Sequence, residues 1–221
     1  RSMNMNFEQA RFNMVEQQIR PWEVLDSRVL SLLQSIPRED FVPVQHRKLA
    51  FADIAIPLAA GQVMMRPKIE ARMLQALEVK EDESVLEIGT GSGFITACLA
   101  ALAAHVVSVE VFEELHREAK ARLESRGTNN IELFIGDAMG DWQPEQAHDV
   151  VVVTGSVPEV PESLLGWVNP GGRLFVVRGE SPAMEACLMT REGVSEWTVE
   201  SLFETDLPRL VNATPNPEFT F

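Results

Sequence analysis

The fold is decided by the stretch Ser84-Val85-Leu86-Glu87-Ile88-Gly89-Thr90-Gly91-Ser92-Gly93. Its first half is a short apolar run typical of a buried strand, its second half is a glycine loop, and residues 94–102 are patterned as a helix. A strand that passes through a glycine loop into a helix places backbone N–H groups and a helix N-terminus at the carboxyl edge of a sheet. The stretch therefore predicts an α/β fold with a ligand site at that edge.

Strands and helices alternate along the chain beyond this stretch. Further strands are expected at residues 105–109, 131–135, 150–154 and 173–177, with helices at 113–125 and 161–167 between them. Two more strand-like runs cover residues 186–190 and 196–203. This alternation predicts a Rossmann-like fold, in which helices cover both faces of a mostly parallel central sheet.

The N-terminal third has a different pattern. Helices are expected at residues 7–20, ended by Pro21, at 26–36 with Asp26 as the N-cap, and at 68–77. The connection from 41 to 67 is irregular, and long connections of this kind are usually functional. We divide the chain into residues 1–66, which hold the N-terminal helices and a substrate-side segment, and residues 67–221, the Rossmann-like part with the C-terminal strands. Together they are expected to form one compact unit.

Acidic residues stand at the ends of three successive predicted strands. Glu87 lies just before the glycine loop, where its charge would repel a pyrophosphate but suit a ligand with an amino group and a sulfonium. Glu110 can accept hydrogen bonds from ribose hydroxyls, and Asp137 is placed to contact an adenine amino group. Read separately, Glu110 also fits a helix start and Asp137 a turn.

The glycine spacing also differs from that of dinucleotide sites. Gly89-x-Gly91-x-Gly93 does not match GxGxxG. The loop and the acids together predict S-adenosylmethionine as the cofactor, with S-adenosylhomocysteine as its product. The candidate cofactor-binding residues are Glu87, Gly89, Thr90, Gly91, Ser92, Gly93, Glu110, Val111, Asp137 and Ala138.

Several motifs resemble those of the protein-L-isoaspartate O-methyltransferases, from about Met14 to Val177. They are Val85 to Ala97, Pro37 to Pro43, Ala52-Asp53 with Pro57-Leu58, Gly61-Gln62, Gly136-Asp137 with Trp142, Asp149 to Thr154, Glu159-Val160-Pro161 and Pro170-Gly171-Gly172. The resemblance implies the class I S-adenosylmethionine-dependent methyltransferase fold. It also implies a protein or peptide substrate, methylated on the free α-carboxylate of an isoaspartyl residue as the first step of repair.

One segment departs from the family pattern Gly-Gln-Thr-Ile-Ser-x-Pro. Here residues 61–67 read Gly-Gln-Val-Met-Met-Arg-Pro, so Val63 replaces the threonine and Met65 replaces the serine associated with catalysis. The C-terminal strand of the family is also replaced, by residues 205–212. By resemblance Met65, Arg66 and Asp53 are the candidate catalytic residues. Arg66 could hold a carboxylate through a bidentate pair, or it could be a solvated side chain.

Two other functions fit parts of the sequence. A protein that binds S-adenosylmethionine but methylates a different acceptor, or serves as a sensor or adaptor without catalysis, would keep the glycine loop and tolerate Val63 and Met65. A nicotinamide-dependent oxidoreductase has only the glycine loop in its favour. The chain has no tyrosine and therefore no Tyr-x-x-x-Lys pair.

Composition and charge narrow the partners further. The net charge of −14 disfavours a nucleic-acid partner. Cys98 and Cys187 are expected to be buried free thiols, and the scattered histidines predict no metal site. We find no apolar run long enough for a membrane span. The sequence thus predicts a cytoplasmic monomer or homodimer.

Overall fold

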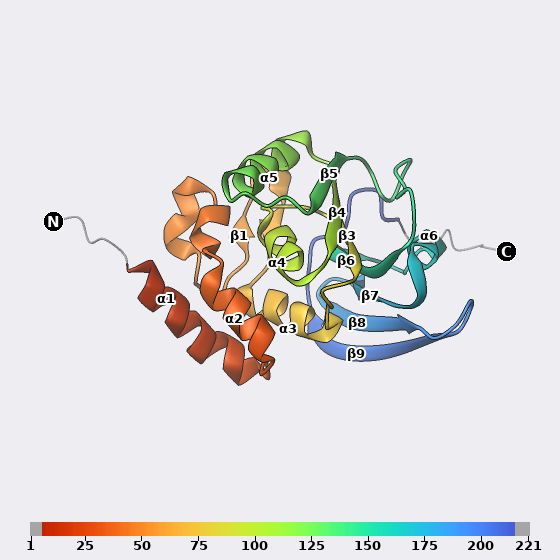
Figure 1. The fold of residues 1–221 in the computed structure, drawn as a ribbon, viewed down its shortest axis with the longest axis horizontal. Helices are drawn as coiled ribbons and strands as arrows, with labels where there is room; N and C mark the ends of the chain where they lie inside the picture. Colours follow the sequence, from red (N-terminus) through yellow and green to blue (C-terminus); the bar gives the residue numbers. More distant parts are fainter. Residues whose placement is uncertain (1–5, 215–221) are drawn as a thin grey trace.

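The computed structural model describes residues 6–214, which form a seven-stranded sheet with helices on both sides (Figure 1). The strand order is β5-β4-β3-β6-β7-β8-β9. Five strands run parallel: β3 (Ser84–Ile88), β4 (His105–Glu110), β5 (Ile131–Ile135), β6 (His148–Val157) and β7 (Val168–Glu180). The last two, β8 (Ala183–Arg191) and β9 (Trp197–Thr205), are antiparallel. The predicted Rossmann-like, mostly parallel fold is confirmed.

The two faces of the sheet are covered by different elements because side chains alternate along each strand. On one face, Val85 joins a core cluster with helices α3 (Pro67–Leu77) and α4 (Phe94–Leu102). On the other face, Leu86 and Ile88 pack in a second cluster with α6 (Glu162–Gly166). Helix α5 (Glu113–Ser125) follows β4 and contributes Leu123 to the first cluster.

The N-terminal helices pack into the first core cluster, together with α3 and α4. The predicted helix 7–20 is α-helical only in α1 (Phe7–Met14), and continues as the π-helix η1 (Val15–Ile19) and the 3₁₀ turn η2 (Arg20–Trp22). Pro21 has no N–H to donate, which prevents a regular last turn. Helix α2 (Ser27–Ser35) begins as predicted, because the Asp26 carboxylate accepts hydrogen bonds from the N–H groups of Arg28 and Val29.

The irregular connection folds into short pieces. It contains the 3₁₀ helices η3 (Arg38–Phe41) and η4 (Val44–Leu49), then the two-stranded ladder of β1 (Ile56–Pro57) and β2 (Val63–Met64) around η5 (Ala59–Gly61). Buried residues of this region, such as Phe41 and Ile56, belong to the same cluster as Val85 and Val150 of the sheet. The N-terminal residues therefore share a core with the Rossmann-like part.

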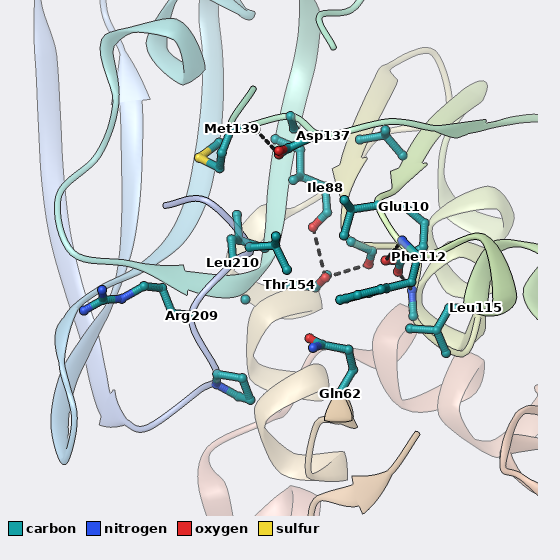
Figure 2. A pocket seen from close by; sticks show the side chains of 18 of the residues that line it. Gln62, Ile88, Glu110, Phe112, Leu115, Asp137, Met139, Thr154, Arg209 and Leu210 are labelled. Atoms are coloured by element: carbon teal, nitrogen blue, oxygen red, sulfur yellow. Dashed lines mark hydrogen bonds between the residues drawn. The ribbon is translucent and has the colours of Figure 1, made fainter. Parts of the chain in front are cut away.

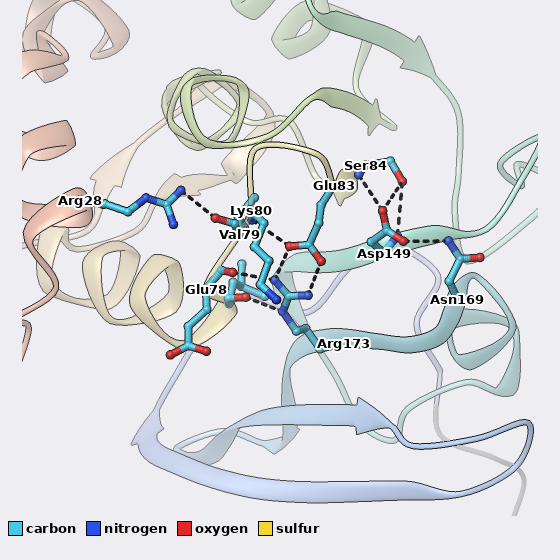
Figure 3. Close-up of polar contacts among 10 residues, drawn as sticks. Arg28, Glu78, Val79, Lys80, Glu83, Ser84, Asp149, Asn169 and Arg173 are labelled. Atoms are coloured by element: carbon cyan, nitrogen blue, oxygen red, sulfur yellow. Dashed lines mark hydrogen bonds and ion pairs between the residues drawn. The ribbon is translucent and has the colours of Figure 1, made fainter.

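A polar network fixes the amino ends of the central strands (Figure 3). Arg173 forms a bidentate pair with Glu83, both distances being 2.7 Å, and also donates to the carbonyls that end α3. Nearby, the Asp149 carboxylate accepts hydrogen bonds from Ser84 and Asn169. These contacts tie α3 to the sheet at the edge opposite the glycine loop.

Both cysteines are buried free thiols, as predicted. Trp142 and Trp167 pack against each other edge to face, with ring centres 6.1 Å apart, beside the second cluster. Within residues 6–214 no helix is long and apolar enough to cross a membrane, and no cluster of His, Cys, Asp or Glu could hold a metal ion.

Candidate functional site

A cavity of about 730 Å³, open to solvent, lies at the carboxyl edge of the parallel strands (Figure 2). We call it the main cavity. Its walls come from the glycine loop, the ends of β4, β5 and β6, the β1–β2 connection and residues 207–211. Of the predicted cofactor residues, those that line it are Gly89, Gly91, Glu110, Val111, Asp137 and Ala138.

Hydrogen bonds from Thr154 of β6 hold the start of the glycine loop in place. Thr154 Oγ1 lies 3.0 Å from the carbonyl oxygen of Ile88 and 2.6 Å from that of Gly89, as Figure 2 shows. Gly89 has a φ of +97°, and a Cβ there would overlap the Thr154 hydroxyl. Only glycine combines this backbone angle with such a close approach. Gly93 does not line the main cavity and instead packs on Ala119 of α5.

Glu110 joins the loop to β4. Its carboxylate accepts hydrogen bonds from the N–H groups of Gly91, at 2.8 Å, and Phe112, at 3.2 Å. The side chain is buried against protein but borders the main cavity. Because a carboxylate oxygen can accept more than one hydrogen bond, Glu110 remains able to contact a ligand.

Asp137 occupies the far wall of the main cavity. One of its oxygens accepts a hydrogen bond from the N–H of Met139 at 2.9 Å, and the other accepts one from the side-chain amide of Asn212. Ala138 and Val111 border the same part of the cavity. A flat apolar group with a polar rim would fit between these walls.

Glu87 faces a smaller neighbouring cavity rather than the main one. This side cavity, of about 310 Å³, is also lined by Glu70, Thr90 and Ser92. One Glu87 oxygen accepts hydrogen bonds from Thr96 and Ser108, while the other, Oε2, is buried with no partner within residues 6–214. Burial raises the pKa of Glu87 to about 8, although the two hydroxyl donors oppose the rise.

Of the three acceptor-side candidates, Met65 and Arg66 border the same cavity, whereas Asp53 lies outside it. Met65 is buried and borders the main cavity, the side cavity and a third, open cavity of about 1160 Å³, the outer cavity. Arg66 is exposed and lines only the outer cavity, and its guanidinium makes no hydrogen bond or ion pair with the described residues. Asp53 lines none of the three and pairs with Lys68 at 3.5 Å.

The C-terminal segment is the part of the site that the sequence motifs did not predict. Residues 207–211 cover one side of the main cavity. Ser156 anchors them: its hydroxyl donates to the carbonyl of Leu207, and its backbone exchanges hydrogen bonds with Pro208 and Leu210, all at 2.9 Å. In Figure 2 the Arg209 side chain extends away from Thr154 and Gln62. Its guanidinium donates a hydrogen bond to Glu180 at 3.2 Å. Thr154 and Phe112 were also missed, although Thr154 is the last residue of the predicted strand 150–154 and Phe112 follows the end of β4, where a site is expected.

Comparison with known proteins identifies the family. The model of the protein-L-isoaspartate(D-aspartate) O-methyltransferase family matches residues 9–205. The chain belongs to this family. Protein-L-isoaspartate O-methyltransferase 2 of Pelobacter propionicus is 39% identical over 209 residues, covering 94% of this chain and 93% of that protein. Protein-L-isoaspartate O-methyltransferase of Methanoculleus marisnigri is 40% identical over 184 residues, covering 83% of this chain and 84% of that protein.

Solved structures show the same fold. A Plasmodium falciparum protein given the name of this methyltransferase family was crystallised with S-adenosyl-L-homocysteine. It superposes with a TM-score of 0.77 at 16% identity, covering 94% of this chain and 99% of that one. Another protein-L-isoaspartate O-methyltransferase gives 0.76 at 24% identity, covering 93% and 66%. The family fold is thus retained in a chain that carries Val63 and Met65 in its substrate segment.

Proposed function

We propose that this member of the isoaspartate O-methyltransferase family transfers a methyl group from S-adenosylmethionine to the free carboxylate of isoaspartyl residues in damaged proteins. The observation that carries the proposal is the position of Met65, at which the main cavity meets the outer cavity. A cofactor in one and an acceptor in the other would meet at this residue.

The residues of the main cavity and the side cavity fit S-adenosylmethionine. The unpartnered Glu87 Oε2 suits the ammonium group of its methionyl part. Glu110 would bind the ribose, and Asp137 with Ala138 the adenine. When bound, S-adenosylmethionine supplies an electrophilic methyl group on a positively charged sulfur.

The acceptor carboxylate needs orientation rather than a base. It is ionised at neutral pH and is already a nucleophile, so Met65 in place of a serine removes no required proton acceptor. The unpaired Arg66 would bind the carboxylate from the outer cavity, where its only acidic neighbours on the lining, Glu204 and Asp206, come from the end of β9 and the residue after it. The chain itself therefore binds, orients and shields the two reactants.

The second candidate is a protein of the same fold with another methyl acceptor or no catalysis. Val63 and Met65 favour it, because both border the main and outer cavities with apolar atoms where the family has hydroxyls. On either function we propose a protein or peptide partner rather than nucleic acid, and a cytoplasmic monomer or homodimer.

The experiment that tests the proposal uses purified protein, methyl-labelled S-adenosylmethionine and an aged protein mixture. Carboxyl methyl esters hydrolyse in mild alkali and release volatile methanol, whereas N-methyl groups survive. Alkali-labile label is the expected result. Alkali-stable label would indicate a different acceptor, and cofactor binding without any transfer would indicate a sensor or adaptor.

A further inference from the structure

A buried ion pair contacts the backbone of Met65, a residue that borders all three cavities, and its acidic member also lines the side cavity. Arg38 of η3 pairs with Glu70 of α3, and the two side chains are 1% and 2% exposed. We propose that this is a positioning pair, in which Glu70 acts through Arg38 to fix Met65 for methyl transfer. The inference rests on the function proposed above.

The guanidinium of Arg38 joins several elements at once. It donates to the carbonyl of Met65 at 2.9 Å and to that of Ala50 at 2.7 Å, besides its contact with Glu70. Its carbon also lies 4.9 Å from the centre of the Phe94 ring. Because Phe94 is the first residue of α4, directly after the glycine loop, one buried cation ties the acceptor-side segment to the cofactor-side helix.

Stability alone does not account for this pair. Apolar residues of similar volume usually stabilise a core as well as a buried ion pair does. A fixed guanidinium fork, in contrast, offers several directed donors, which hold backbone carbonyls at defined positions. Met65 borders all three cavities, so a shift of its backbone would move the wall on both sides. Burial raises the pKa of Glu70 to about 7, and Arg38 opposes this rise.

The test removes both charges together. The double variant Arg38→Met/Glu70→Leu leaves no buried charge unpaired and is expected to fold. A matched control is Arg11→Met/Glu39→Leu, which removes another largely buried pair, at 2.6 Å, whose residues line none of the three cavities. For each we would measure the melting temperature, the dissociation constant of S-adenosylmethionine, and kcat and KM with an isoaspartyl peptide.

Because Glu70 also lines the side cavity, activity is compared at saturating S-adenosylmethionine, after the dissociation constant of each variant has been measured. Under these conditions the first variant is expected to lose about tenfold to a hundredfold in kcat/KM for the peptide, as small misplacements of reactants do. The control is expected to keep its kcat/KM. Glu70→Gln, which can still accept a hydrogen bond from Arg38, is expected to retain most of the activity. Unchanged kcat/KM in the first variant, or an equal loss in the control, would overturn the proposal.

Amide hydrogen exchange gives a reading that does not depend on catalysis. Residues 62–65 are expected to exchange faster in Arg38→Met/Glu70→Leu, while β6 exchanges as in wild type. If wild-type protein transfers no methyl group, the proposed function fails, but exchange still decides the positioning role. Unchanged exchange at residues 62–65 contradicts that role whatever the activity.

Discussion

Glu87 shows how one buried carboxylate can link cofactor binding to pH. With a pKa raised to about 8 by burial, it is mostly protonated at neutral pH. A cationic ammonium group beside it favours the ionised form, so binding of S-adenosylmethionine should release a proton, and affinity should rise as pH increases toward 8. Calorimetry in two buffers of different ionisation enthalpy measures the release.

The neutral variant Glu87→Gln is the control for this prediction. It should bind more weakly, because the ammonium group loses its counter-charge, and without any proton release. Proton-neutral binding by wild type, with an affinity that does not change between pH 6 and 9, would show that Glu87 does not face the ammonium group.

Arg66 is the residue on which acceptor binding should depend most. It is exposed on the outer cavity and has no partner among the described residues. Arg66→Ala should raise KM for an isoaspartyl peptide by about tenfold to a hundredfold, as expected for the loss of a charge-assisted contact worth roughly 1.5–3 kcal/mol. Arg117→Ala, at an exposed arginine of α5, should leave KM unchanged. Equal KM values for the two variants would exclude Arg66 from acceptor binding.

At the scale of an element, the glycine loop depends on its contact with β6. Gly89→Ala would force Cβ against Thr154 Oγ1 and should greatly weaken cofactor binding. The control is Gly127→Ala, where φ is also positive, at +71°, but nothing lies within 4 Å of the added carbon. It should cost only about 1–2 kcal/mol for the left-handed backbone. Thermal unfolding and calorimetry compare the two, and similar cofactor affinities would contradict the role given to the contact.

Elements with a strong local pattern were predictable from sequence. Residues 94–102, 113–125 and 131–135 are found with the predicted bounds, because apolar periodicity and flanking glycines specify them locally. Residues 206–213 have no such pattern. Their position depends on hydrogen bonds to Ser156, which lies about fifty residues earlier in the chain. Their place in the wall of the main cavity could therefore not be predicted from the sequence.

The candidate site was predicted only in part, for a related reason. The strand-end rule located Glu110 and Asp137 correctly at the main cavity. It did not show that Glu87 turns to the opposite face from Leu86 and Ile88, toward hydroxyl donors from α4 and β4. Alternation along a strand indicates the face, but the partners on that face depend on packing between elements.

For the whole molecule, the N-terminal helices and the sheet are joined by contacts that no local pattern reveals. The guanidinium carbon of Arg72 lies 5.2 Å from the ring centre of Trp22 and 5.5 Å from that of Phe203, linking η2 to β9 through α3. The outer cavity lies between these same parts and is lined by Trp22, Lys68 and Glu204. The outer cavity, which is the proposed acceptor side, therefore forms only when these distant segments pack together.

The most direct measurement compares two synthetic peptides that differ only in having an isoaspartyl or a normal aspartyl residue. Purified protein is incubated with each peptide and methyl-labelled S-adenosylmethionine, after calorimetry has established that the cofactor binds. Label on the isoaspartyl peptide alone is the predicted result. Tight cofactor binding with no label on either peptide, or equal label on both, would contradict the account.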